Sequence, residues 1–150
     1  MIKTEAEYQE CLKRLEEDLK VANAQRVRLE EMNLAADQIE HAMEPILSFH
    51  AQLKEEVEWY ERVKRRDFGV ITQLTELGSL LVALRITNGM TQSELAKRLG
   101  VDISQVSRDE RNEYHGISFE RAERVLQALD EELQISVKRR KRKSNLMTAS

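Results

Sequence analysis

The chain has 150 residues, of which 34% are charged and 5% aromatic, with one proline, five glycines and a net charge of −3. This composition favours an all-α protein of one or two small domains with an elongated part, and it argues against a sheet protein. No run of about 20 apolar residues is present, no hydrophobic signal region opens the chain, and the single Cys11 cannot form an internal disulfide. We therefore expect a cytoplasmic protein without a membrane span, in which Cys11 is an inert thiol.

Residues 1–66 are predicted to form a helical arm. Thr4 and Glu7 have the spacing of a capping box, in which a hydroxyl and a carboxylate each accept a backbone N–H at the start of a helix. The stripe that follows alternates spacings of three and four (Leu12, Leu15, Leu19 and Ala22). Because Arg26 and Asn33 interrupt it, a long amphipathic helix is a simpler prediction than a full coiled coil.

A second long helix is predicted over about residues 34–66, with a kink or break near Glu44 because Pro45 lies inside it. Its apolar stripe is regular (Met43, Ile46, His50, Leu53, Val57 and Tyr60). Matching stripes predict an antiparallel hairpin or coiled-coil arm, which would serve dimerisation or partner binding because it has little core of its own. Phe49 and Trp59 lie off the stripe, so they either form a second contact face or pack at the hairpin seam or on the next domain.

Residues 67–137 are predicted to form a second domain of short helices. One helix is predicted over about residues 75–87, before Asn88-Gly89, and Ser118 caps a last helix that ends near Leu129. After it, Leu133, Ile135 and Val137 alternate with polar residues, which predicts a short C-terminal strand. A lone strand needs a partner, either in its own domain or across a dimer.

Between these helices lies the stretch TQSELAKRLGVDISQVSRDERN, residues 91–112, which predicts two short helices joined by a tight turn. Thr91 and Glu94 form a capping box, and Gly100 stands where the first helix stops. Asp102 begins the second helix, with Gln105 placed for another capping box. In addition, Val101 is placed to plug the core and Val106 points inward. The outer face of the second helix then carries hydrogen-bonding groups suited to base edges in a major groove (Ser104, Gln105, Ser107 and Arg108).

This stretch resembles the helix-turn-helix of the XRE/Cro/lambda-repressor-like family, whose usual run is TQxxLAxxLGVxxSxVSRxE, and the resemblance covers about residues 75–130. It implies a lambda-repressor-like domain in a bacterial or phage transcriptional regulator, a homodimeric repressor that reads a palindromic site in double-stranded DNA. The opening IKTEAEYQECLKRLEEDL is similar to the start of some HigA-type antitoxins. An antitoxin that represses its own operon is therefore one alternative, and a protein-interaction module whose arm carries the function is another.

The resemblance also implies roles for individual residues. Base reading falls to the outer face of the second helix (Ser104, Gln105, Ser107 and Arg108), where Ile103 departs from the polar residue that relatives often carry. Phosphate binding falls to the start of the first helix and to the loop after the second (Thr91, Gln92, Asn112, Tyr114 and His115). Arg85 and Glu110 match a family ion pair, which we interpret as structural.

Charge is distributed unevenly along the chain. Residues 67–137 hold seven Lys/Arg and twelve Asp/Glu, whereas residues 138–143 are six consecutive basic residues. We expect residues 138–150 to be a disordered basic tail whose first residues, Lys138, Arg139 and Arg140, bind DNA phosphates. The tail could instead hold acidic lipids or RNA, or simply keep the protein soluble.

The three histidines and Cys11 lack metal-ligand spacing, and the chain has neither a nucleophile arrangement nor a phosphate-cradling glycine loop, so we expect no metal, no cofactor and no enzyme activity.

Overall fold

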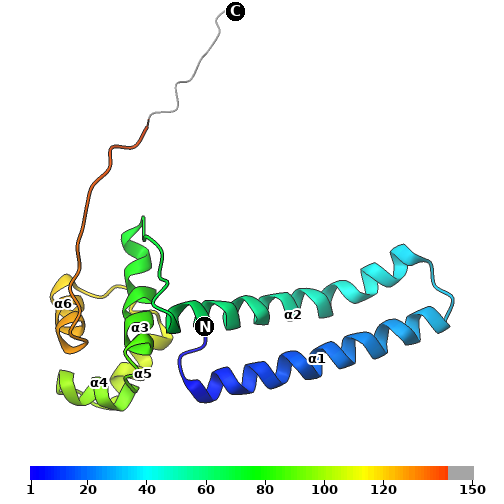
Figure 1. The fold of residues 1–150 in the computed structure, drawn as a ribbon, viewed down its shortest axis with the longest axis horizontal. Coiled ribbons are helices and arrows are strands. Elements are labelled where there is room, and N and C mark those ends of the chain that lie inside the picture. The colour runs from blue at the N-terminus through cyan, green and yellow to red at the C-terminus, as the bar shows by residue number, and fades with distance from the viewer. Residues whose placement is uncertain (142–150) are drawn as a thin grey trace, which may run out of the picture.

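The computed structural model describes residues 1–141, and all regular structure in that range is helical. Its elements are α1 (Glu5–Glu31), α2 (Ala36–Lys64), a 3-10 turn η1 (Leu74–Glu76), α3 (Leu77–Thr87), α4 (Gln92–Leu99), α5 (Ile103–Arg111) and α6 (Phe119–Ala128). Figure 1 shows α1 and α2 lying side by side as a long arm, with the four shorter helices gathered at one end. The all-α class predicted from composition is confirmed.

The arm is the predicted antiparallel hairpin. At its start the Thr4 hydroxyl accepts the Glu7 amide at 3.2 Å and the Glu7 carboxylate accepts the Thr4 amide at 3.3 Å, so the predicted capping box is present. Asn33, with a φ of +53°, lies in the turn that reverses the chain. Near this turn the two helices bury a small apolar cluster between them (Ala22, Leu29, Ile39 and Met43). The stripes therefore pack largely on each other within one chain.

The alternative of a break near Glu44 is wrong, because α2 runs without interruption from Ala36 to Lys64 with Pro45 inside it. Pro45 is exposed, so its ring does not disturb the seam with α1. Met43 before it and Val57 after it are both buried, so packing holds both halves of the helix in place. These contacts offset the loss of one backbone hydrogen bond at the proline.

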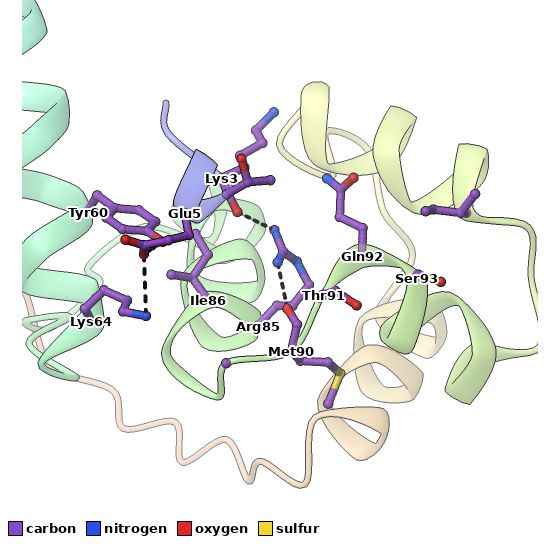
Figure 2. A pocket seen from close by; sticks show the side chains of 13 residues that line it. Lys3, Glu5, Tyr60, Lys64, Arg85, Ile86, Met90, Thr91, Gln92 and Ser93 are labelled. Atoms are coloured by element: carbon purple, nitrogen blue, oxygen red, sulfur yellow. Dashed lines mark hydrogen bonds and ion pairs between the residues drawn. The ribbon is translucent and has the colours of Figure 1, made fainter. Parts of the chain in front are cut away.

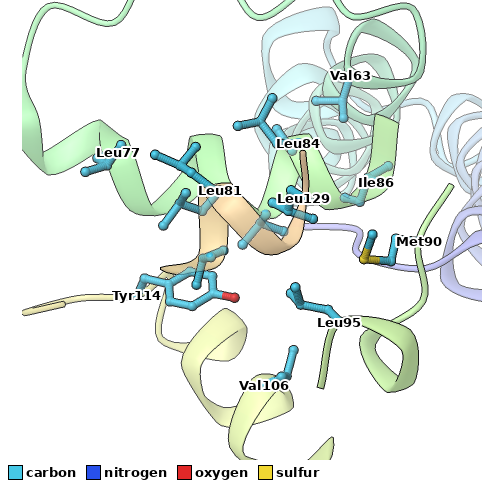
Figure 3. Close-up of a cluster of buried hydrophobic side chains, with 14 of the residues drawn as sticks. Val63, Leu77, Leu81, Leu84, Ile86, Met90, Leu95, Val106, Tyr114 and Leu129 are labelled. Carbon is cyan, nitrogen blue, oxygen red and sulfur yellow. The ribbon is translucent and has the colours of Figure 1, made fainter. Parts of the chain in front are cut away.

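The base of the arm shares a core with the short helices (Figure 3). Val57, Tyr60 and Val63 of α2 join the buried residues of α3 to α6 in one cluster, which also contains Ile2. Tyr60 stacks on Tyr8 with ring centroids 4.8 Å apart. The Tyr60 hydroxyl donates to Glu5 at 3.1 Å, and burial, together with this carboxylate, raises the pKa of Tyr60 to about 12.

The two aromatic residues off the stripe have different surroundings. Trp59 packs against the shared core, beside α3. Phe49 is 48% exposed on the arm, with the Arg14 guanidinium over its ring at 4.9 Å. Cys11 is half-buried against the shared core, and burial raises the pKa of its thiol.

The predicted C-terminal strand is absent from the described chain, since residues 131–141 leave α6 as an extended segment without a pairing partner (Figure 1). The start of the segment is anchored, because Arg66 bonds both carboxylate oxygens of Glu131 at 2.9 and 3.1 Å. Beyond this anchor, Ile135 is 70% and Val137 93% exposed. A ladder needs N–H and C=O groups on an adjacent strand, and residues 1–141 offer none there.

Candidate nucleic-acid interface

Local hydrogen bonds build the two-helix unit as its sequence indicates. The Thr91 hydroxyl accepts the Glu94 amide at 3.1 Å, and the Glu94 carboxylate accepts the Thr91 amide at 2.7 Å, which lowers the pKa of Glu94. Gly100 closes α4 with a φ of +68°, a conformation that a side chain would strain. Asp102 caps α5 by accepting the Ser104 amide at 2.8 Å, and hydrogen bonding with Ser104 lowers the pKa of Asp102.

Two local expectations in this unit are wrong. Gln105 does not complete a capping box, because its amide donates to Asp109 one turn further along the helix, at 3.0 Å. Asp109 is in turn held by Arg121 of α6 at 2.7 Å. Val101 does not plug the core but is 41% exposed.

A buried ion pair fixes the end of α5. Arg85 of α3 is 3% exposed and Glu110 of α5 is fully buried. The Arg85 guanidinium donates through Nε and Nη2 to both carboxylate oxygens of Glu110. It also donates to the Met90 carbonyl at 2.8 Å and to the Lys3 carbonyl at 3.0 Å (Figure 2). Arg85 therefore connects α5, the turn before α4 and the N-terminal segment.

The same pair engages Gln92, for which phosphate binding was expected. Gln92 is half-buried, and its amide nitrogen donates to Glu110 at 2.7 Å. Thr91 is exposed; in the capping box its backbone amide donates and its hydroxyl oxygen accepts, so the hydroxyl can still donate to another group. The groups here that can still donate to a phosphate are the second N–H of the Gln92 side-chain amide, the Thr91 hydroxyl and the free backbone amides of the first turn of α4.

The four expected base readers differ in how accessible they are. Ser104 and Arg108 are exposed, whereas Gln105 and Ser107 are half-buried. Arg108 makes only long contacts, 3.3 Å from Nε to the Ser104 carbonyl and 3.3 Å from Nη2 to the Gln105 side-chain oxygen. Its guanidinium can exchange these for a base, while Gln105 must first release Asp109.

Of the three residues in the loop after α5 that were expected to bind phosphate, two are exposed and one is a buried aromatic. Asn112 and His115 are exposed and, with Arg108 and Arg121, line a hollow of about 170 Å³. Tyr114 is 5% exposed and lies in the core facing Leu81 and Leu95 (Figure 3). Burial raises the pKa of its phenol, and no other group in residues 1–141 hydrogen-bonds its hydroxyl. Tyr114 is thus a core residue and is not positioned to hold a phosphate.

Sequence reasoning missed Gly78, in the first turn of α3. A Cβ at this position would lie 1.8 Å from the Glu113 carbonyl oxygen, so the absence of a side chain lets α3 approach the loop after α5. The signal in the sequence was a glycine inside an otherwise apolar helix, a position where glycine often marks a close backbone approach.

Lys138, Arg139 and Arg140 lie on the extended segment beyond α6 and are exposed. Residues 142–150 of the expected tail lie outside the described residues.

These features define a helix-turn-helix DNA-binding domain. It consists of a capped short helix, a glycine turn and a second helix with an exposed polar face, and a buried ion pair holds the second helix in place. The helix-turn-helix family model matches residues 81–135. Residues 81–135 are an XRE/lambda-repressor-like helix-turn-helix domain, and this domain supports a DNA-binding transcription regulator of that type. The matched family is one of DNA-binding domains and not of enzymes. No curated protein and no solved structure matches the chain.

Within residues 1–141, no helix has both the length and the apolar character needed to cross a bilayer. In the same range, no three His, Cys, Asp or Glu side chains come together as metal ligands.

Proposed function

We propose that the protein is a homodimeric, sequence-specific repressor that reads a palindromic operator with α5 in the major groove. The observation that carries this proposal is the open polar face of α5, with Ser104 and Arg108 exposed, on a helix whose far end is fixed by the buried Glu110. A rigidly held helix presents its side chains to bases without a further ordering cost. Arg108 would grip a guanine with two hydrogen bonds, with Ser104, Gln105 and Ser107 beside it.

Phosphate contacts would set the register of this helix on the duplex. We assign them to the start of α4, at Thr91 and Gln92, and to Asn112 and His115 in the loop after α5. The basic segment beyond α6 (Lys138, Arg139 and Arg140) would add contacts along the backbone. Such a regulator would work in the cytoplasm, at the nucleoid. We divide the chain accordingly into an arm (residues 1–66), a DNA-binding domain (67–137) and a basic tail (138–150).

The unpaired segment after α6 supports a dimer. Leu133, Ile135 and Val137 alternate with polar residues in an extended stretch anchored at Glu131, and their exposure rises from 39% to 93% along it. A second copy of the same segment would supply the missing ladder and cover these side chains. Two α5 helices would then enter successive major grooves, about 34 Å apart.

We expect Arg108→Ala to abolish sequence preference while leaving the fold intact, because Arg108 is exposed and its side chain makes only long contacts among residues 1–141. The measurement is selection of bound sequences from a random duplex library with full-length protein, read by sequencing. The matched control is Arg124→Ala, the loss of one exposed arginine from α6. A palindromic motif that disappears only in the Arg108 variant supports the proposal. An unchanged motif in that variant contradicts the base-reading role, and a motif with one half-site contradicts the dimer.

We expect truncation after Val137 to flatten the salt dependence of DNA binding. Each lost phosphate contact removes about 0.9 from the slope of log affinity against log salt concentration. The measurement is fluorescence anisotropy at several salt concentrations. The control is a chain of full length in which residues 138–143 are all glutamine. Equal slopes in the wild type, the truncated chain and the glutamine chain would show that the tail does not touch DNA.

An antitoxin that masks a toxin with its arm is the second candidate, and the charge of the arm favours it. Residues 16–44 contain eight Asp/Glu and three Lys/Arg, and the nearby Val21 and Phe49 are 61% and 48% exposed. Such a surface suits a basic protein partner. A small basic protein that co-purifies with the full chain, and is lost in the Phe49→Ser variant, would support the antitoxin.

A further inference from the structure

The DNA-binding domain is short of free cations. Of the seven Lys/Arg in residues 67–137, Arg85 is buried, Arg98 pairs with Asp130 at 3.1 Å and Arg121 pairs with Asp109 at 2.7 Å. The remaining four (Lys97, Arg108, Arg111 and Arg124) must offset an excess of acidic residues in the same range. None of these four lines the pocket at the start of α4, where a phosphate would bind. If this protein holds DNA as proposed above, another part of the chain must supply positive charge at that point.

The N-terminal segment, residues 1–4, lies beside this point and is fixed there. Ile2 is 2% exposed within the shared core, and the Met1 ammonium pairs with Glu56 of α2 at 3.2 Å. The Lys3 amide donates to Glu7 at 2.8 Å, and the Lys3 carbonyl accepts from Arg85 at 3.0 Å. Both backbone groups of Lys3 are therefore engaged, which restricts where its side chain can go.

The side chain of Lys3 adjoins the expected phosphate site. Lys3 lines a pocket of about 330 Å³ together with Gln92 and Ser93 of the first turn of α4 and with Ile103, the first residue of α5. In the view of Figure 2, Lys3 and Gln92 both lie above the Arg85 guanidinium. The Lys3 ammonium has no ion pair within residues 1–141, whereas Lys64, on the other wall of the pocket, faces Glu5 at 4.0 Å.

We propose that Lys3 binds the DNA backbone phosphate that meets the start of α4, so that the N-terminal segment is part of the DNA-binding face. The inference rests on the proposed function and extends it to a residue outside the helix-turn-helix. The segment is held by Glu56 and Glu7 of the arm, so the arm also determines where this charge lies. A structural change in the arm would then alter DNA affinity by moving Lys3.

The test measures binding of full-length protein to a fluorescent duplex of random sequence, by anisotropy at several salt concentrations. Lys3→Gln removes the charge but keeps the backbone contacts of residue 3. We expect the slope of log affinity against log salt to fall by about 0.9, and affinity at about 0.15 M salt to fall about fivefold. The matched control is Lys20→Gln, which removes one exposed charge from α1 at a residue paired with Glu16. Lys20→Gln should leave the slope unchanged.

Further variants separate the contact from a structural effect. Lys3→Arg keeps the charge and should restore the wild-type slope. Melting temperatures of all variants should agree, because the Lys3 ammonium has no ion pair among residues 1–141. A Lys3→Gln slope equal to that of the wild type overturns the Lys3 contact and leaves the proposed repressor standing. An equal loss in Lys3→Gln and Lys3→Arg also overturns it, since charge is then not the cause. A wild type that binds no duplex at any salt concentration refutes the repressor and the contact together.

Discussion

Arg85→Ala is expected to lower the free energy of unfolding by about 3–5 kcal/mol, a large part of the stability of a small protein. The substitution leaves the Glu110 carboxylate fully buried without its cation. It also removes the donors to the carbonyls of Met90 and Lys3, at 2.8 and 3.0 Å. Because these groups belong to α5, the turn before α4 and the N-terminal segment, the substitution should destabilise both the short helices and the base of the arm. Urea denaturation followed by circular dichroism measures the change in the free energy of unfolding.

Two control variants distinguish the loss of the buried ion pair from the loss of any arginine. Arg98→Ala removes an arginine that is 49% exposed and pairs with Asp130, and it should cost no more than about 1 kcal/mol. The double variant Arg85→Met with Glu110→Leu replaces the pair by apolar groups, and it should recover much of the loss because no buried charge is left alone. If Arg85→Ala were no worse than Arg98→Ala, the pair would not be what fixes α5.

Gly78→Ala is expected to destabilise the protein by about 1–3 kcal/mol or more, the range of overpacked cores. The new Cβ would lie 1.8 Å from the Glu113 carbonyl oxygen and 2.8 Å from its carbon, so α3 and the loop must separate. The loop has little room to yield. Glu113 and Tyr114 already have φ values of +49° and +51°, and the Tyr114 side chain is anchored in the core.

Thermal unfolding of Gly78→Ala against Ser79→Ala measures this effect. Ser79 is the next residue of α3, and its hydroxyl makes one contact with the Glu113 carboxylate at 3.3 Å. Ser79→Ala should shift the melting temperature only slightly, whereas Gly78→Ala should lower it by several degrees. Equal melting temperatures for the two variants would mean that the loop moves freely away from α3, contrary to its packing in the structure.

Short-range features of this protein were predictable because they depend on residues three or four positions apart. The capping boxes at Thr4 and Thr91 and the cap at Ser118 were each placed at the right residue. The apolar stripes of the arm correctly predicted an antiparallel hairpin. The pairing of Arg85 with Glu110 followed from the resemblance and is present. The starts of both helices of the motif and the end of the first were predicted to within one residue.

The remaining features depend on which distant groups meet, and local pattern carries no information about that. Lys3 bonds Arg85 across 82 positions of the chain, and Gln92 turns toward Glu110 instead of toward solvent. Tyr114 looked like a polar loop residue, but the close approach of α3 at Gly78 places it in the core. The sequence by itself determined the short helices of the DNA-binding domain and their caps, since these arise from hydrogen bonds and periodicity within a few residues; the face that would meet DNA stays a prediction. Only the tertiary structure decided which of the candidate side chains are free to bind DNA. Some of their hydrogen-bond donors are buried or paired with distant residues, whereas others are exposed and unpaired within the described residues.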